Sequence, residues 1–162
     1  MQVLPDREFL IWLAGFFDGE GCITMNRIRR GGRVILFPRV VIAQSNPAIL
    51  SLIQRAVGRG EVYRKQKRKW KDPYEWVITG SEAVEVMKCL LPFLRIKREQ
   101  AEVFLKLPAG RRWRRVGLSE QMLRERVWFE LRELKRPARK EEAESRRQEN
   151  MDLWAGGVRR QS

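Results

Sequence analysis

Two acidic residues alternate with two glycines at residues 18–21, where an apolar stretch near the start of the chain ends. Apolar side chains recur at helical spacing over residues 9–17, and Asp6 precedes them as an N-cap, so this stretch is predicted to be a buried helix. Carboxylates at the negative end of a helix dipole are unfavourable, so Asp18 and Glu20 need an explanation. A bound cation would supply one, and an ordinary helix end with solvated acids is the alternative.

The composition limits the chemistry that such acids could perform. The chain of 162 residues contains no histidine, which excludes histidine general bases, two-Cys two-His zinc fingers and nucleases that depend on histidine. Hydrolysis would therefore rely on carboxylates, lysines, amides and an oxygen-binding metal such as Mg²⁺. The chain has 34 Lys and Arg residues against 20 Asp and Glu residues, which gives a formal net charge of +14. This excess favours a polyanionic partner, with nucleic acid ahead of a membrane surface.

Two hairpins are predicted to carry much of this positive charge. In residues 22–30 and 33–44 the side chains alternate as in β-strands, and Gly31 and Gly32 form a two-residue turn between the two segments. Pro38 in the second strand suggests a bulge or an edge position. Residues 61–70 and 74–79 form the second hairpin. A run of charge is most often a solvated surface, but here it recurs on two hairpins with aromatic residues interleaved, which favours nucleic-acid binding.

Helices are predicted between and after the hairpins. One helix begins at Asn46 and another at Gly80. A third follows residues 91–101 and continues through Leu107, and a last one starts at Ser119. The fold class is therefore α+β, with one domain over residues 1–138 and a polar, weakly ordered tail over residues 139–162. The start has no signal-peptide pattern, no stretch is long enough to span a membrane, and two cysteines are too few for a disulfide framework. We therefore expect an intracellular protein of an archaeal or bacterial cytoplasm or of an organelle.

Residues 13–21, with the letters LAGFFDGEG, closely resemble the motif of the LAGLIDADG homing endonucleases. Residues 91–101, LPFLRIKREQA, resemble a second signature of the same family, which follows the second hairpin. The resemblance implies an αββαββα half-unit with a saddle-shaped antiparallel sheet and C-terminal helices. One motif in one chain implies a homodimer that makes metal-dependent double-strand breaks at a long, near-palindromic DNA target and so promotes intron mobility.

The same resemblance implies roles for individual residues. Glu20 would bind Mg²⁺, or another divalent cation such as Mn²⁺, together with the backbone carbonyl of Gly19. Gln44 would order solvent at the scissile phosphate, and Lys97 would stabilise that phosphate or polarise water, although both could be ordinary surface residues. Asp18 would be a structural cap. The dimer interface would contain Leu13, Ala14, Gly15 and Phe17, where small residues allow another backbone to approach.

A two-stranded ribbon fits the DNA major groove, so side chains on the two hairpins are the candidates for DNA contacts. They are Asn26, Arg27, Arg29, Arg30, Arg33, Arg39, Arg64, Lys65, Gln66, Lys67, Arg68, Lys69, Trp70, Lys71 and Tyr74. A non-cleaving binder built on the same fold, an RNA maturase or a regulator, is the alternative function, in which case RNA would be the partner. A general basic RNA-associated protein is a third possibility, and it would show no sequence preference at moderate salt.

Overall fold

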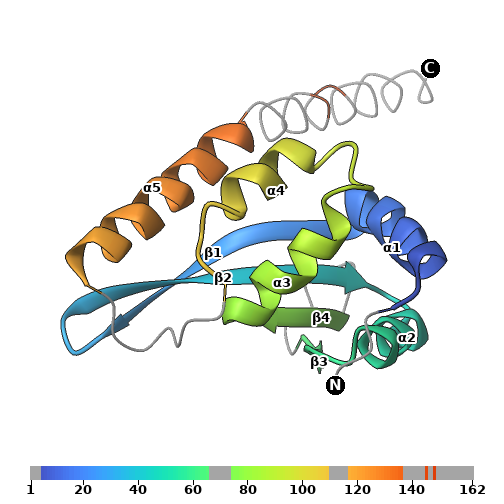
Figure 1. Ribbon diagram of the computed structural model, residues 1–162. Coiled ribbons are helices and arrows are strands. Elements are labelled where there is room, and N and C mark those ends of the chain that lie inside the picture. The colour runs from blue at the N-terminus through green and yellow to red at the C-terminus, as the bar shows by residue number, and fades with distance from the viewer. Residues whose placement is uncertain (1–4, 66–73, 110–116, 137–144, 146–147, 149–162) are drawn as a thin grey trace, which may run out of the picture. The chain divides into compact units, whose positions relative to one another are not determined.

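Four antiparallel strands form one sheet in the order β1-β2-β4-β3. The computed structural model describes residues 5–65, 74–109 and 117–136, together with Ser145 and Gln148. The strands are β1 (Gly21–Arg30), β2 (Arg33–Gln44), β3 (Glu61–Arg64) and β4 (Tyr74–Thr79). The α+β class and the predicted order of helices and hairpins are confirmed (Figure 1).

The turn of the first hairpin sets the register of its strands. Gly31 and Gly32 both have a positive φ, of 56° and 74°, which side chains other than glycine rarely adopt. Arg30 therefore lies opposite Arg33, and Gly21 lies opposite Ile42 at the other end of the hairpin. Pairing of β2 with β4 starts only at Arg39. Pro38 consequently lies where β2 has no such neighbour, in agreement with the predicted edge position.

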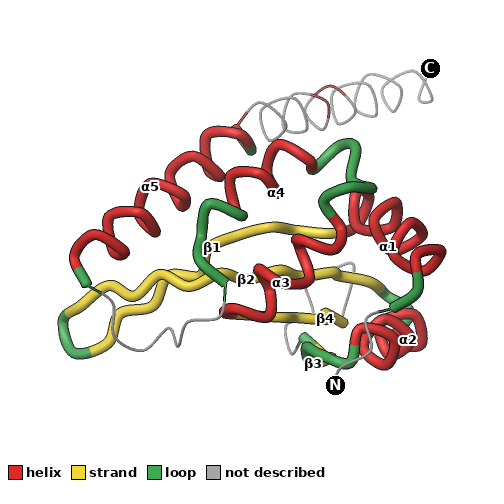
Figure 2. Tube along the Cα trace, viewed as in Figure 1, coloured by secondary structure: helices red, strands yellow, loops and turns green. Residues whose placement is uncertain are grey.

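Five helices are described: α1 (Arg7–Glu20), α2 (Pro47–Val57), α3 (Gly80–Leu90), α4 (Arg98–Phe104) and α5 (Leu118–Leu134). Side-chain caps explain where two of them begin. The Asp6 carboxylate accepts a hydrogen bond from Phe9 N at 2.8 Å, and the Asn46 side chain caps α2 in the same manner through Ala48 N at 3.0 Å. Helices lie over one face of the sheet, as Figure 2 shows in red against the yellow strands.

The alternation of side chains divides the sheet into two faces. The helix-covered face carries residues of the hydrophobic core, among them Ile23, Met25, Val40, Ile42, Trp76 and Ile78. The other face, called the outer face below, carries the residues that alternate with these. On the first hairpin they are the directly paired residues Thr24 with Arg39, Asn26 with Phe37, Ile28 with Ile35, and Arg30 with Arg33.

The chain divides into two units, Met1–Leu131 and Arg132–Ser162, and the sheet and its core belong to the first. The domain boundary predicted after residue 138 stays a prediction. Most of the predicted tail, the tip of the second hairpin and much of the arginine-rich stretch at 108–117 lie outside the described residues. In the described part of the chain, no helix has the length and apolar character needed to cross a membrane.

Candidate active site and nucleic-acid interface

Helix α1 passes into strand β1 without a linker, so the acidic motif lies where the two elements meet. A Cβ atom on Gly21 would come within 2.3 Å of the Phe17 ring, so only glycine fits this close approach. Phe17 is fully buried, and its packing fixes the end of the helix. Glu20 is the last residue of α1, and its side chain is exposed. The motif therefore presents one carboxylate to the surroundings from a rigid support.

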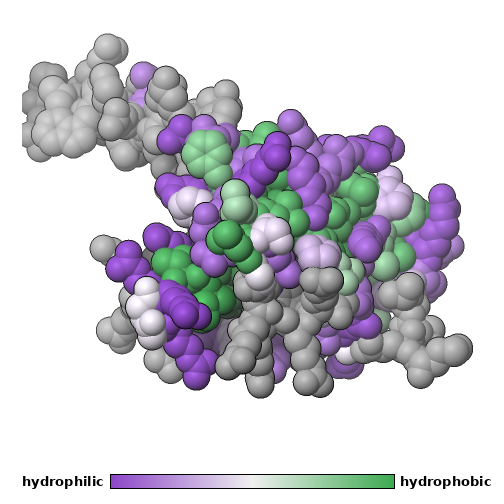
Figure 3. Space-filling model, turned by 60° about the vertical axis from the view of Figure 1, so that its left-hand side comes forward, coloured by the Kyte–Doolittle hydropathy of each residue, from purple (hydrophilic) through white to green (hydrophobic). Residues whose placement is uncertain are grey.

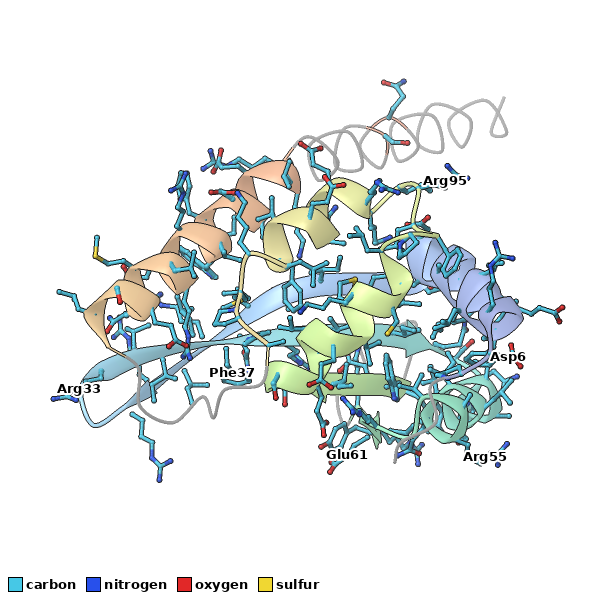
Figure 4. All side chains as sticks on the ribbon, viewed as in Figure 1. Asp6, Arg33, Phe37, Arg55, Glu61 and Arg95 are labelled. Carbon is cyan, nitrogen blue, oxygen red and sulfur yellow. The ribbon has the colours of Figure 1, made fainter. Side chains whose placement is uncertain are left out.

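The second acid of the motif, Asp18, has backbone partners. Its side chain is only 7% exposed, and its two oxygens accept hydrogen bonds from Arg95 N at 2.7 Å and from Lys97 N at 2.9 Å. Hydrogen bonds to a charged acceptor are stronger than neutral ones. Asp18 thus ties the end of α1 to the segment before α4, which is 77 residues further along the chain. Figure 4 labels Arg95 at this junction.

The same junction positions Lys97. The Lys97 ammonium donates a hydrogen bond to the backbone carbonyl of Asp18, and its side chain is half-buried. A cation is favourable at the C-terminal end of a helix, where carbonyl groups carry partial negative charge. Lys97 therefore reaches the end of α1 immediately beside Gly19 and Glu20. Two of the three predicted catalytic residues, Glu20 and Lys97, are brought together by contacts that link distant parts of the sequence.

Gln44 is the last residue of β2 and lies two residues beyond Ile42, the partner of Gly21. It therefore lies at the end of the strands where α1 joins β1. Its side-chain oxygen accepts hydrogen bonds from Ser45 N at 2.8 Å and from Ser45 Oγ at 3.2 Å. The amide oxygen of Gln44 is therefore occupied by hydrogen bonds from the residue that follows it in the chain.

The donors at the motif suit a hard cation. Glu20 and the carbonyl of Gly19 offer oxygen ligands, which Mg²⁺, Mn²⁺ and Ca²⁺ prefer. Asp18 is occupied by two backbone N–H groups and does not add a third donor. Among the described residues, no group of three or more His, Cys, Asp or Glu side chains could hold a metal. One copy of the chain thus contributes a single exposed carboxylate here, and a cation would need further ligands from water, phosphate or a second copy.

The predicted interface residues differ in their burial. Leu13, Ala14 and Phe17 are fully buried in the single chain and contribute to its own core, and their place in a dimer interface stays a prediction. Gly15 is exposed, and a Cβ placed on it would meet no atom within 4 Å. The exposed face of α1 also contains Ile11, at 43% exposure, and Trp12, at 39%.

The outer face of the sheet collects some of the predicted DNA-binding residues. Asn26, Arg30, Arg33 and Arg39 lie on it by register, and Figure 4 shows Arg33 at the tip of the first hairpin. Lys65 joins them through Glu75, whose carboxylate lies 2.8 Å from Lys65 Nζ and 3.4 Å from Arg39 Nη2. On the outer face, the Glu75 carboxylate therefore positions the side chains of Arg39 and Lys65. This use of Glu75 was not predicted, because nothing in the local pattern distinguishes it from a solvated acid.

Other predicted DNA-binding residues lie elsewhere. Arg27 shares the helix-covered face with Met25, and its guanidinium lies 5.9 Å from the ring centre of Trp128 in α5. By register Arg29, Arg64 and Tyr74 are also on that face. Strict alternation from Ile23 already indicates this for Arg27 and Arg29. The predicted residues Gln66, Lys67, Arg68, Lys69, Trp70 and Lys71 lie outside the described residues.

Helix α5 contributes an unpredicted buried cation that supports the first hairpin. Arg124 is 2% exposed and donates to the Leu36 carbonyl of β2 at 3.0 Å and to Glu120 at 2.8 Å. Leu36 lies opposite Arg27, so the Arg124 and Trp128 contacts fall on one rung of the hairpin. Arginines are rarely buried, and no sequence signal distinguishes Arg124 from its exposed neighbours.

Comparison with known proteins identifies the class to which this fold and site belong. Residues 13–95 match the sequence model described as LAGLIDADG endonuclease, and this is half of the chain. The chain belongs to that family. The resemblance noted in residues 13–21 and 91–101 is thus confirmed as a family relationship.

Individual relatives are consistent with this membership. The DNA endonuclease I-CvuI of Chlorella vulgaris is 32% identical over 107 residues, which are 63% of this chain and 65% of that protein. A crystal structure of I-CvuI with the I-CreI target in the presence of Mg, in which the DNA is not cleaved, has 30% identity. It covers 62% of this chain and 66% of the I-CvuI chain, at a TM-score of 0.53. The archaeal intron-encoded homing endonuclease I-Vdi141I, solved with DNA, shares the fold at a TM-score of 0.63. The match covers 79% of this chain and 85% of that one, with 17% sequence identity.

Proposed function

We propose that this protein is a site-specific endonuclease that cleaves double-stranded DNA with the help of a divalent cation. The main support is the junction at the end of α1, where Asp18 holds Lys97 at the last turn of the helix, which also carries the exposed Glu20. Hydrolysis of a phosphodiester needs groups that neutralise phosphate charge and activate water, and this junction brings a carboxylate and an ammonium together. The relatives named as DNA endonucleases support the same assignment.

Each group at the junction has a distinct proposed role. Glu20 and the carbonyl of Gly19 would hold the cation, which would supply neutralisation of phosphate charge and activation of water. Lys97 places positive charge near the phosphate, where negative charge increases during the reaction. Gln44 orders solvent from the end of β2 and would exchange its bonds to Ser45 for water when DNA is present. Asp18 positions Lys97 and does not bind the cation.

Two cuts require two such junctions, and one chain has one motif, so we propose a homodimer. Two-fold symmetry would match a near-palindromic target. The exposed face of α1, with Ile11, Trp12 and Gly15, is the proposed contact between the two copies. Gly15 has open space around it in the single chain, so its lack of a side chain would serve close approach by a second helix.

The dimer is tested with Gly15→Leu. A Cβ at this position meets no atom within 4 Å in the single chain, and leucine replaces a helical glycine, which favours the helix by about 1 kcal/mol. The variant should sediment as a folded monomer, whereas the wild type sediments as a dimer. Ala48→Leu, which adds the same side chain at an exposed position of α2, should stay dimeric. A Gly15→Leu protein with wild-type dimer affinity contradicts this interface.

Cleavage is tested on the host site of the mobile intron that we propose encodes this chain. Supercoiled DNA in which the flanking sequences are joined should be cut with Mg²⁺ or Mn²⁺ and left intact with a chelator, and DNA with the interrupted site should not be cut. Glu20→Gln should slow cutting by at least about 100-fold. Glu8→Gln, at the exposed acid in the first turn of the same helix, is the matched control and should cut normally.

Equal cutting by Glu20→Gln and wild type would exclude the proposed metal ligand. Tight binding to DNA or to intron RNA without cleavage in any divalent metal would instead support a maturase or a regulator on the same fold. Action on genomic DNA would place the protein in an archaeal or bacterial cytoplasm or in an organelle.

A further inference from the structure

Three large apolar side chains lie on the outer face of the first hairpin. Ile28 pairs directly with Ile35, and Phe37 pairs with Asn26 on the next rung. Ile28 is 40% exposed, and Ile35 and Phe37 are half-buried. None of the three belongs to the hydrophobic core or to the residues that pack against it, although the neighbouring Val34 does. We call Ile28, Ile35 and Phe37 the apolar patch.

The surroundings of the apolar patch are cationic. Arg30 and Arg33 lie one rung beyond it towards the turn, and Arg39 lies one rung beyond it towards the root of the hairpin, all on the same face. Figure 3, which brings the hairpin end of the molecule forward, shows hydrophobic residues exposed among hydrophilic ones. An exposed apolar strand surface is an aggregation hazard that proteins normally avoid, so a binding role is the better explanation.

Positive charge on both sides of the patch indicates what occupies it. A polyanion with apolar groups between its charges fits, whereas an apolar protein surface would offer no negative charge to Arg30 and Arg33, and Arg39 would have only its contact with Glu75. Double-stranded DNA has this character in its major groove, which admits a two-stranded β-ribbon. The C5-methyl group of thymine is the apolar group on the base edges there.

We propose that the apolar patch recognises thymine methyl groups in the major groove of the target DNA, with Asn26 next to the patch facing an adenine. This inference rests on the proposed function, because it assumes that the outer face of the hairpin meets DNA. Apolar side chains read thymine by its methyl group, and asparagine pairs with the N6 and N7 edge of adenine. Arg30, Arg33 and Arg39 then contact phosphates or guanines on either side.

The spacing of the patch matches the spacing of base pairs. Alternate residues on one face of a strand are about 7 Å apart, because each residue rises about 3.4 Å. Base pairs also rise about 3.4 Å along the DNA axis, so the two rungs of the patch cover about two to three adjacent base pairs. The proposal therefore predicts a short A·T-rich block in each half-site, where the hairpin lies.

The experiment uses the full-length protein and a pool of duplex DNA with a randomised segment. Wild-type protein selects its preferred sequences, and each enriched thymine is then replaced by deoxyuridine, which removes only the methyl group. At the thymines under the hairpin, binding measured by fluorescence anisotropy should weaken about fourfold for each methyl group removed, the value expected for one buried methyl group.

Variants assign the effect to the patch. In Ile28→Thr/Ile35→Thr, which keeps β-branched residues in both strands and leaves Phe37 in place, the preference for thymine over deoxyuridine should fall below fourfold at the base pairs opposite residues 28 and 35. Leu52→Ala provides the control, since Leu52 on α2 is 41% exposed but lies on a helix away from the outer face. It should retain the fourfold preference for thymine. If the double variant does not fold, the replacement of thymine by deoxyuridine in wild-type complexes still decides the question.

The outcomes separate this inference from the proposed function. A selection that enriches no sequence overturns site-specific DNA binding and the inference with it. Enriched sites that bind equally well with thymine and deoxyuridine overturn the inference alone. A fourfold thymine preference that is unchanged at every position in Ile28→Thr/Ile35→Thr shows that other residues read the methyl groups, and it also overturns the inference.

Discussion

Asp18→Asn tests whether the junction at the end of α1 depends on the Asp18 carboxylate. The asparagine side chain is nearly the same size, but it has one oxygen acceptor instead of two. Its NH₂ group would face either Arg95 N or Lys97 N, so at least one backbone donor would lose its partner. Because Asp18 is only 7% exposed, water cannot readily replace the missing acceptor. The substitution should therefore weaken both the fold and the placement of Lys97.

The magnitude follows from the two hydrogen bonds. A hydrogen bond to a charged group contributes about 1.5–3 kcal/mol, and a buried donor without a partner costs about 1–3 kcal/mol. We expect Asp18→Asn to lower the free energy of unfolding by about 2–4 kcal/mol. For a chain of this size the melting temperature would fall by about 5–15 °C. Cleavage should also slow at temperatures where the variant is fully folded, since the backbone N–H of Lys97 donates to the Asp18 carboxylate and this bond helps to position Lys97.

The assay is denaturant unfolding followed by circular dichroism, with all proteins at one concentration because a dimer's stability depends on concentration. Asp6→Asn is the matched control, since it makes the same change at the start of the same helix. Asparagine caps helices as well as aspartate does, so this control should stay within about 0.5 kcal/mol of wild type. If Asp18→Asn unfolds as Asp6→Asn does, the carboxylate is not what holds the junction together.

Two further predictions concern other parts of the fold. Arg124→Met should lower the free energy of unfolding by about 3–5 kcal/mol, because it leaves the Leu36 carbonyl and the Glu120 carboxylate without this partner. Hydrogen exchange should then accelerate most in β2, and a loss below about 1 kcal/mol would contradict this bracing role. Burial raises the pKa of the Cys89 thiol, so less thiolate is present near neutral pH. Alkylation of Cys89 should therefore be slow, and its rate should still increase as the pH rises through the alkaline range. Mass spectrometry should find the exposed Cys22 labelled first, and equal rates at the two cysteines would refute the prediction.

Local sequence was sufficient for the elements of this fold. Asp6 and Asn46 have side chains that cap helices, and both helices begin where these residues predict. Gly31 and Gly32 supply the two positive φ angles of a tight hairpin, and from that turn the register follows residue by residue. These features depend on short-range sterics and hydrogen bonds, which neighbouring residues determine. The motif at residues 13–21 and the absence of histidine likewise limited the chemistry to carboxylates, lysines and oxygen-binding metals.

The assignment of side chains to surfaces was less complete from sequence. Alternation places Arg27 and Arg29 with the apolar residues of β1, yet both had been expected to contact DNA on the strength of their charge. The contact between Arg27 and Trp128 exists only because α5 packs on that face. Packing likewise decided that Leu13 and Phe17 lie in the core of their own chain, which the sequence motif did not indicate.

Tertiary structure alone decided what holds the acidic motif in place. From the residues themselves Asp18 and Glu20 are two carboxylates at an unfavourable helix end, and only the family resemblance gave them different expected roles. Folding brings Arg95 N and Lys97 N to Asp18 from more than 70 residues away, and this makes Asp18 a buried anchor while Glu20 stays exposed. The contact of Arg124 with Leu36, across 88 residues, is of the same kind. Such pairings depend on how whole elements dock, and no local pattern in the sequence records them.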